Sequence, residues 1–179
     1  AERIGQEFDR YCAFLKSLAR EHDVTFHYVQ HSHTERVIPL MLAARGIFVQ
    51  RHDPPPESLT DFYRGLDIHI CQMMHSSVLS LGAGVPTINF GYDIKNQGLF
   101  DLMGLTEFYF SSWNFDHDAA LTAARKLIAE RQPIAAAIHE RSAELRTQLN
   151  AFLKRIKAEQ DGRALSYESG GKPLHQPPA

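Results

Sequence analysis

The sequence predicts an α/β protein built on a doubly wound, Rossmann-like parallel sheet, followed by C-terminal helices. Short apolar segments rich in β-branched and aromatic residues alternate five times with helical segments. Parallel strands need crossover connections, so helices between consecutive strands cover both faces of the sheet. The chain has 179 residues, 44% of them hydrophobic, which is enough to bury one such core. We therefore expect one domain over residues 1–160 and a flexible tail over 161–179, where apolar periodicity is lost.

The individual elements follow from hydrophobic spacing and from residues that break regular structure. An amphipathic helix is predicted over the first twenty residues, where apolar side chains recur every three or four positions. A second helix starts near Thr34, carries Val37, Ile38, Met41 and Ala44, and ends at Gly46. Strands are predicted at 24–29, 47–50, 67–71, 87–90 and 108–110, and further helices at 57–64, 76–83, 96–103, 117–131 and 133–157.

Composition disfavours several function classes. The 19 basic and 21 acidic side chains give a formal net charge of −2, and no basic cluster is long enough to follow a nucleic-acid backbone. No apolar run approaches the roughly 20 residues that a transmembrane helix needs. Cys12 and Cys71 are too few for a disulfide framework, which favours a reducing, cytoplasmic setting. We expect no nucleic-acid partner and no transmembrane segment.

Ligands of doubly wound sheets bind beyond the carboxyl ends of the strands, and polar residues are dense at these places. His75 and Ser76 come where the third strand turns into a helix, so that an imidazole and free backbone N–H groups would face a bound anion. We take His75 as the candidate catalytic residue. The candidate substrate-binding residues are His31, Ser32, Arg51, Ser76, Tyr92 and Lys95.

Plainer interpretations of these residues remain open. Ser76 could simply cap a helix, with His75 as a partly exposed loop residue. His69 lies inside a strand and is expected to be structural, and Cys71 is expected to be a small buried side chain rather than a nucleophile. We expect no metal site, because neither His31 with His33 nor the set of His69, Cys71 and His75 has a spacing typical of metal ligands.

Three segments resemble the carboxy-terminal half of the polysaccharide pyruvyl transferase family. They are Asp67-Ile-His-Ile-Cys-Gln-Met-Met-His75-Ser, Ser80-Leu-Gly-Ala-Gly84-Val-Pro86-Thr-Ile-Asn-Phe-Gly91-Tyr92-Asp93-Ile-Lys95, and Gly98-Leu-Phe-Asp-Leu-Met-Gly104-Leu. The resemblance implies a fold of the GT-B type and the transfer of a pyruvyl group from phosphoenolpyruvate to a sugar of a cell-surface polysaccharide, without a cofactor. It implies that His75 is the general acid, and that Tyr92 and Lys95 contact the donor or the acceptor.

The sequence departs from the family at two places. Family members carry an arginine two residues before the histidine, where this chain has Met73, which offers neither charge nor donors to an anion. In the family a strand and an acceptor-binding domain precede the opening helix, so the resemblance implies an N-terminal domain of the same protein as a partner. Arg51 or Lys95 could supply the missing cation.

Two other functions remain open. A GT-B glycosyltransferase that uses a nucleotide sugar would need an acidic residue to bind the ribose, for which Glu107 is a poor candidate. A catalytically inactive binding domain is favoured by Met73. Both alternatives are compatible with the predicted fold.

Overall fold

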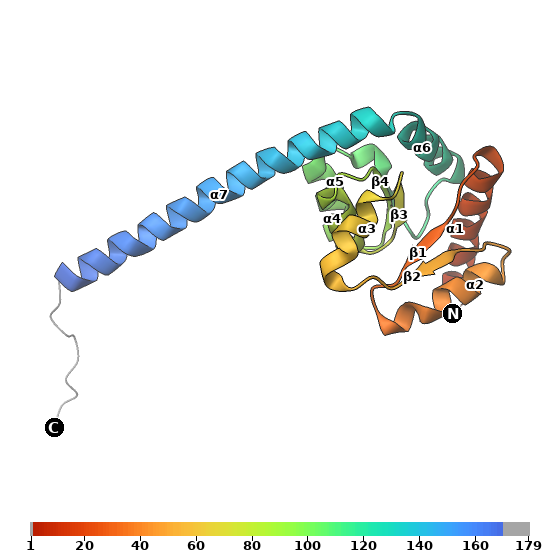
Figure 1. The fold of residues 1–179 in the computed structure, drawn as a ribbon, viewed down its shortest axis with the longest axis horizontal. Coiled ribbons are helices and arrows are strands. Elements are labelled where there is room, and N and C mark those ends of the chain that lie inside the picture. The colour runs from red at the N-terminus through yellow and green to blue at the C-terminus, as the bar shows by residue number, and fades with distance from the viewer. Residues whose placement is uncertain (1, 170–179) are drawn as a thin grey trace, which may run out of the picture. The chain divides into compact units, whose positions relative to one another are not determined.

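The computed structural model describes residues 2–169, and divides into the compact units Ala1–Glu140 and Arg141–Ala179. The strands are β1 (His27–Val29), β2 (Gln50–His52), β3 (His69–Cys71), β4 (Thr87–Gly91) and β5 (Tyr109–Ser111). The α-helices are α1 (Glu2–Glu21), α2 (Ile38–Ala43), α3 (Leu59–Arg64), α4 (Met74–Gly82), α5 (Ile94–Met103), α6 (His117–Ala129) and α7 (Arg131–Ser169). Short 3-10 turns η1 (His33–Val37), η2 (Pro56–Ser58) and η3 (Thr106–Phe108) complete the order shown in Figure 1.

The predicted parallel α/β fold is confirmed. All strand pairs run parallel, with β1 beside β2 and with β4 between β3 and β5. The strands form two ladders, β1-β2 and β3-β4-β5, and no backbone ladder joins β1 to β3 within residues 2–169. The two ladders are therefore separate, whereas in a doubly wound sheet all strands belong to one continuous sheet.

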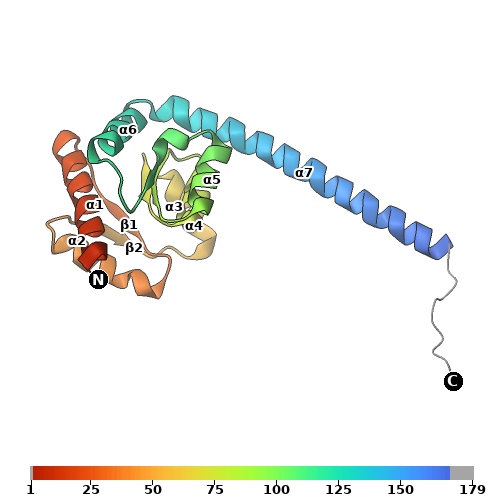
Figure 2. The same cartoon turned by 180° about the vertical axis from the view of Figure 1, so that it is seen from behind.

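Helices cover both faces of the central strand β4, as a doubly wound sheet requires. Phe90 points toward α1 and packs against Phe14 and Phe115, with ring centroids 5.0 and 4.6 Å apart. Thr87 and Asn89 point to the opposite face, toward α4. Figure 2 shows α1 beside α6, and these two helices are in contact. Alternation along β4 therefore places an aromatic core on one face and a polar interface on the other.

Two elements differ from their prediction at the start of the sheet. The second helix is shorter than predicted, because α2 covers only Ile38–Ala43; it buries Pro39 and Leu42 and leaves Met41 exposed. A 3-10 turn precedes this six-residue helix and changes the phase of its side chains. The next strand, β2, begins three residues later than predicted. Gly46 has a left-handed φ of 74°, and the chain turns there before it becomes extended at Gln50.

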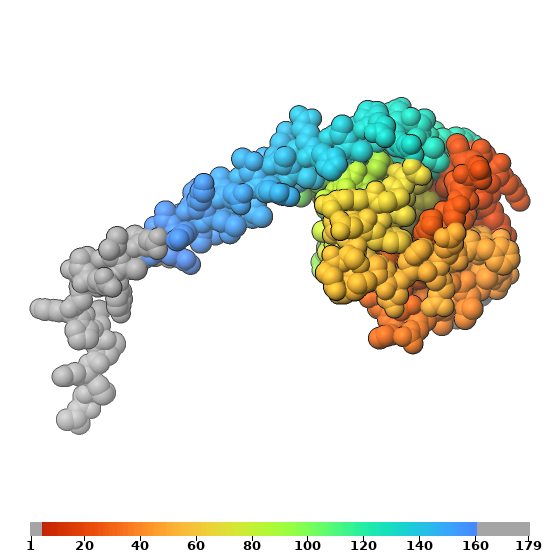
Figure 3. Space-filling view, viewed as in Figure 1, coloured from red at the N-terminus to blue at the C-terminus, as the bar shows by residue number. Residues whose placement is uncertain are grey.

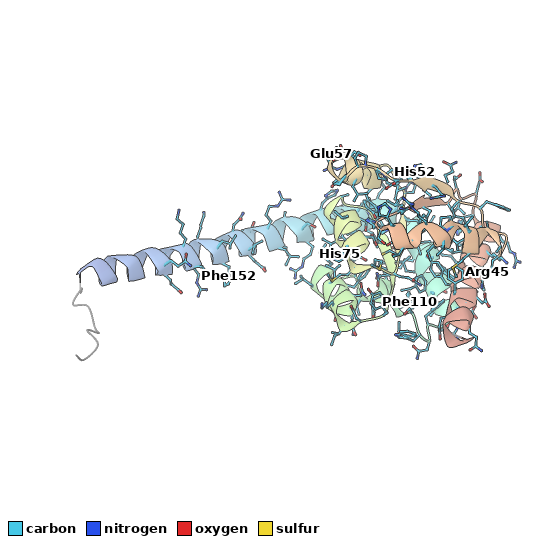
Figure 4. All side chains as sticks on the ribbon, turned by 90° about the horizontal axis from the view of Figure 1, so that it is seen from below. Arg45, His52, Glu57, His75, Phe110 and Phe152 are labelled. Carbon is cyan, nitrogen blue, oxygen red and sulfur yellow. The ribbon has the colours of Figure 1, made fainter. Side chains whose placement is uncertain are left out.

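The C-terminal helices form as predicted, with a shifted boundary between them. α7 begins at Arg131, ahead of Pro133, and continues through Ser169, past residue 161 where the sequence predicts a tail. Residues 170–179 of that predicted tail lie outside the described residues. Within the first unit α7 buries Ile134 and Ile138. Further along α7, Leu149, Phe152, Leu153 and Ile156 are exposed, and Phe152 is labelled in Figure 4.

Residues 2–169 contain no helix that combines the length and the apolar character needed to cross a membrane. Cys12 and Cys71 are both free and buried.

Candidate functional site

The carboxyl ends of β1, β3 and β4 place predicted site residues at one edge of the first unit. His31 follows β1, and His75 is the second residue of α4, directly after β3. The Tyr92 hydroxyl, which follows β4, lies 3.8 Å from the Met73 sulfur. His75 lies close enough to His31 to contribute to the lowering of the His31 pKa. The edge therefore gathers two imidazoles, a phenol and the start of a helix, with His75 exposed on α4 (Figure 4).

The start of α4 offers backbone donors to a ligand. Met73 is the N-cap residue and provides no side-chain capping bond. The first helical hydrogen bond of α4 is donated by the Ser77 N–H to the Met73 carbonyl oxygen, at 3.2 Å. The N–H groups of Met74, His75 and Ser76 precede it and have no acceptor within a helix. Such groups, together with the helix dipole, favour a bound anion.

Ser76 does not cap this helix, so the capping interpretation of Ser76 is wrong. Ser76 is the third residue of α4, is buried, and donates its hydroxyl to the Met73 carbonyl at 2.9 Å. His75 accordingly lies in the first helical turn instead of a loop. Its exposed ring stands beside the free N–H groups, which is the arrangement that the functional interpretation requires.

A polar interface with β4 fixes the orientation of α4. The Ser77 hydroxyl accepts from Asn89 Nδ2 at 2.9 Å and lies 3.0 Å from the Cys71 sulfur. One turn later, the Ser80 and Thr87 hydroxyls are 2.9 Å apart. These buried bonds hold one face of α4 against the sheet, so His75 must point outward.

The sequence prediction missed this interface. The sequence pattern that indicates it is a pair of serines three residues apart on a helix, Ser77 and Ser80, together with alternate polar residues on an apolar strand, Thr87 and Asn89.

Cys71 is a buried structural residue, as expected. Its thiol contacts Ser77, and burial raises the pKa of Cys71 above its usual value. A thiol held protonated in the core is a poor nucleophile.

His31 is held in place by two neighbours. Its Nε2 lies 2.8 Å from the Tyr63 hydroxyl, and its backbone N–H donates to a Glu35 carboxylate oxygen at 2.9 Å. Desolvation lowers the pKa of His31; Glu35 opposes this effect and His75 adds to it. A neutral, oriented imidazole can donate or accept a hydrogen bond with a ligand.

His69 is structural, as expected. Its Nδ1 lies 2.9 Å from the Ser80 hydroxyl, and its ring packs edge-on against Tyr63 at 5.0 Å. Burial lowers the pKa of His69 from 6.5 to about 3. The imidazole therefore stays neutral in the folded protein over the whole physiological range.

This lowered pKa predicts a dependence of stability on pH. The unfolded chain binds a proton at His69 near pH 6.5, whereas the folded chain does so only near pH 3. The contribution of His69 to the free energy of unfolding is therefore complete above pH 6.5 and declines as pH falls toward 3, by at most about 1.4 kcal/mol per pH unit. Urea unfolding at pH 7 and pH 5 measures this decline. His69→Asn, which keeps a polar atom near the Nδ1 position, should lose less stability between the two values; an equal loss would contradict the assignment.

The remaining predicted residues lie at the edges of this region. Ser32 is exposed and its hydroxyl lies 2.6 Å from that of Thr34. Arg51 lies within β2 instead of after it, and its side chain reaches Gln30 at 3.4 Å. Lys95 is exposed in the first turn of α5, after the N-cap Asp93. No hydrogen bond brings Ser32, Arg51 or Lys95 to His75 among the described side chains.

A cavity of about 600 Å³ opens below this edge. His31, Met73 and Ser76 line it near the strand ends, and its wall also includes β1, β3, the segments that lead into them and the apolar face of α1. In Figure 3 the orange and yellow atoms, which include α2 and α3, lie beside the red atoms of α1 on the visible face of the first unit. Because β1 and β3 both contribute lining residues, the cavity lies between the two ladders.

Among the described side chains, no three His, Cys, Asp or Glu residues are grouped closely enough to hold a metal ion. His27 and His52 are 2.9 Å apart on adjacent strands, without a third ligand.

Comparison with known protein families finds a match over the part of the chain that contains His31 and His75. Residues 7–94 match the polysaccharide pyruvyl transferase family. This region of the chain is similar to that family, and it makes up just under half of the chain. The match spans α1 to the start of α5, and so includes His31, Met73, His75 and Tyr92, while Lys95 follows directly after it. A search of curated proteins finds no match.

The fold also resembles that of a solved transferase. A mutant of the Thermobaculum terrenum O-GlcNAc transferase superimposes with a TM-score of 0.55 and 20% sequence identity. The similarity covers 74% of this chain and 28% of the transferase chain. It supports a GT-B-like α/β fold and extends over only part of the larger protein.

Proposed function

We propose that this chain is the donor-binding part of an enzyme that transfers the pyruvyl group of phosphoenolpyruvate to a sugar of a surface polysaccharide. His75 supports the proposal most directly, because it lies exposed in the first turn of α4, beside backbone N–H groups that favour an anion. Phosphoenolpyruvate is a small anion whose methylene carbon must receive a proton. The family of residues 7–94 supports the same reaction class.

The proposed reaction needs a general acid and an anion-binding site. The His75 imidazolium gives its proton to the methylene carbon of phosphoenolpyruvate, and positive charge develops on the carbon that bears the phosphate. A sugar hydroxyl attacks this carbon and returns a proton to His75. A second hydroxyl then displaces phosphate, and its own proton is released, so that a ketal and inorganic phosphate are formed. The N–H groups at the start of α4 stabilise the phosphate or the carboxylate throughout.

His31 and Tyr92 complete the donor side of the proposed site. His31 can donate or accept a hydrogen bond while neutral, and Tyr63 fixes its orientation. The Tyr92 hydroxyl extends over Met73 and can reach a ligand at the start of α4. Lys95 supplies a positive charge two residues beyond Asp93, and we infer that it supports the donor or the acceptor.

Titration with ligands tests the proposed donor. Phosphoenolpyruvate should raise the melting temperature of the protein, and amide hydrogen exchange should slow in the first turn of α4. Nucleotide sugars at the same concentrations serve as the comparison. Stabilisation by nucleotide sugars alone would favour a glycosyltransferase, and stabilisation by neither ligand would favour the inactive binding domain.

Met73 gives this proposal a gain-of-binding prediction. Met73→Arg places a guanidinium at the N-cap of α4, beside the Tyr92 hydroxyl, where it can form a charge-assisted pair with the phosphate or carboxylate. We expect the affinity for phosphoenolpyruvate to increase about tenfold, as measured by calorimetry. Val78→Arg adds the same charge to an exposed position of the same helix, away from its N-terminus, and should leave the affinity within about twofold. Equal gains from both variants would show a general charge effect and contradict a site at Met73.

The nucleotide-sugar alternative rests on fold similarity, and its candidate ribose-binding acid is Glu107. Glu107 is paired with Lys126, whose Nζ lies 2.9 and 2.7 Å from the two carboxylate oxygens. This ion pair competes with a ribose for the Glu107 carboxylate. The two free cysteines are consistent with the cytoplasmic location that we propose for the enzyme.

A further inference from the structure

In the second unit, α7 carries a stripe of exposed apolar side chains. Leu149, Phe152, Leu153 and Ile156 are between 37% and 55% exposed, and Figure 4 shows Phe152 projecting from the helix. Leu145, one turn earlier, is partly exposed. Consecutive residues of an α-helix are turned by about 100°, so these five side chains share an arc of about 100° on one side of α7. We call them the apolar stripe; removing them from water would be favourable.

Basic side chains border the apolar stripe. Arg146 and Lys157 lie along one border, Arg155 lies near the other, and Lys154 lies on the opposite side of the helix. The segment 145–157 contains these four basic residues and no Asp or Glu, although the whole chain has a formal net charge of −2. The segment is therefore both amphipathic and strongly cationic. Helices with this combination bind at the interface between water and lipid.

We propose that residues 145–157 of α7 bind the surface of an anionic lipid bilayer. The helix lies parallel to the surface, with the apolar stripe among the outer parts of the acyl chains and the basic side chains at the lipid phosphates. Thirteen helical residues extend about 20 Å, which is shorter than the roughly 30 Å of hydrocarbon that a spanning helix must cross. The proposal does not depend on phosphoenolpyruvate as the donor.

Charge complementarity favours a lipid surface over a second copy of this helix. Leu149, Phe152 and Ile156 have the spacing of a coiled-coil seam, but the positions that flank such a seam include Arg146 and Arg155 and no acidic residue within the segment. A dimer through the apolar stripe would bring these like charges together without partners. An anionic bilayer offers a phosphate group to each of them.

The form of the segment also suits a bilayer. A protein partner would need a groove of matching shape with acidic walls, whereas lipids rearrange around an inserted side chain. The long stems of Lys and Arg can lie along apolar surface while their charges reach the headgroups. Glu144, which accepts from Arg141 at 2.8 Å, and Glu159 lie beyond the two ends of the segment. We therefore expect the contact with lipid to be confined to residues 145–157.

Sedimentation with vesicles tests the proposal on the 179-residue chain. Vesicles of phosphatidylcholine with about 30% phosphatidylglycerol are compared with vesicles of phosphatidylcholine alone, at equal lipid concentration. Each Lys or Arg near an anionic surface contributes about fivefold to the affinity, so the chain should bind the mixed vesicles at least about tenfold more tightly. Added salt should weaken this binding, because it screens the attraction between the charges.

A matched pair of variants separates insertion of the apolar stripe from charge alone. Phe152→Glu and Ala151→Glu each add one negative charge, at neighbouring exposed positions of the same helix, and Ala151 lies outside the apolar stripe. Ala151→Glu should weaken binding to the mixed vesicles by about fivefold, and Phe152→Glu by about fiftyfold or more. Circular dichroism on heating should show melting temperatures within a few degrees of each other. Equal losses from both variants would overturn the insertion of the apolar stripe.

Two further results would overturn the proposal. A concentration-dependent dimer that Phe152→Glu disperses and Ala151→Glu does not, without binding to either kind of vesicle, would assign the apolar stripe to a second copy. Failure of the natural full-length polypeptide to bind vesicles that the 179-residue chain binds would show that another part of the polypeptide covers the stripe. Vesicle binding is measured without phosphoenolpyruvate, so failure of the donor proposal leaves this result interpretable.

Discussion

Replacing His75 by glutamine is expected to reduce the rate of pyruvyl transfer by about 10²- to 10⁴-fold, because the reaction loses its general acid. The melting temperature should change by only a few degrees, since the ring is exposed in the first turn of α4 and the described residues show no hydrogen bond to it. Phosphate release from phosphoenolpyruvate in the presence of acceptor, measured with the natural full-length polypeptide, gives the rate. Circular dichroism on heating gives the stability.

His33→Gln is the matched control for this variant. His33 is an exposed histidine on η1, so its replacement removes the same chemical group from a nearby surface. The transfer rate should stay within about twofold of the natural protein. A fully active His75→Gln protein would rule out general-acid catalysis by this residue, and an unfolded one would assign His75 a structural role.

Gly91→Ala is expected to cause a large loss of stability, because the end of β4 has no room for a methyl group. A Cβ at this position would lie 2.5 Å from Tyr109 Cε2, 2.6 Å from Asn96 Cβ and 2.7 Å from Asn89 Oδ1. All three neighbours are held by packing in the sheet or in α5. An added methyl group therefore forces the backbone or these side chains to move. We expect a decrease of about 3 kcal/mol in the free energy of unfolding, measured by urea denaturation.

Gly98→Ala provides the opposite expectation. Gly98 lies within α5, and a Cβ there would meet nothing within 4 Å. Alanine favours the helix over glycine, so this variant should be about 0.5 to 1 kcal/mol more stable. If Gly91→Ala were as stable as the natural protein, the close packing around the end of β4 would be refuted. That packing also positions Tyr92, so the Gly91 variant should bind phosphoenolpyruvate more weakly.

The alternation of apolar strands and helices predicted the α/β class, and this succeeded because burial on both faces leaves a local pattern. β4 is the clearest case, since each of its residues is buried. The resemblance around His75 and Tyr92 also lies in contiguous residues, and the match over residues 7–94 agrees with it. By contrast, the helix predicted from Thr34 begins later, because a 3-10 turn over His33–Val37 precedes α2.

The sequence by itself determined the fold class and most of the residues that follow the strands, with Arg51 as an exception because it lies within β2. Only the tertiary structure decided which of these residues lie close together: His31 and His75 are 44 positions apart in the chain, and Met73 meets Tyr92 across β3 and β4. The tertiary structure also revealed the buried bonds of Ser77 and Asn89 and the cavity between β1 and β3. The physical reason is that hydrophobic periodicity depends on neighbours along the chain, whereas hydrogen bonds across layers and the order of strands in a sheet depend on long-range contacts.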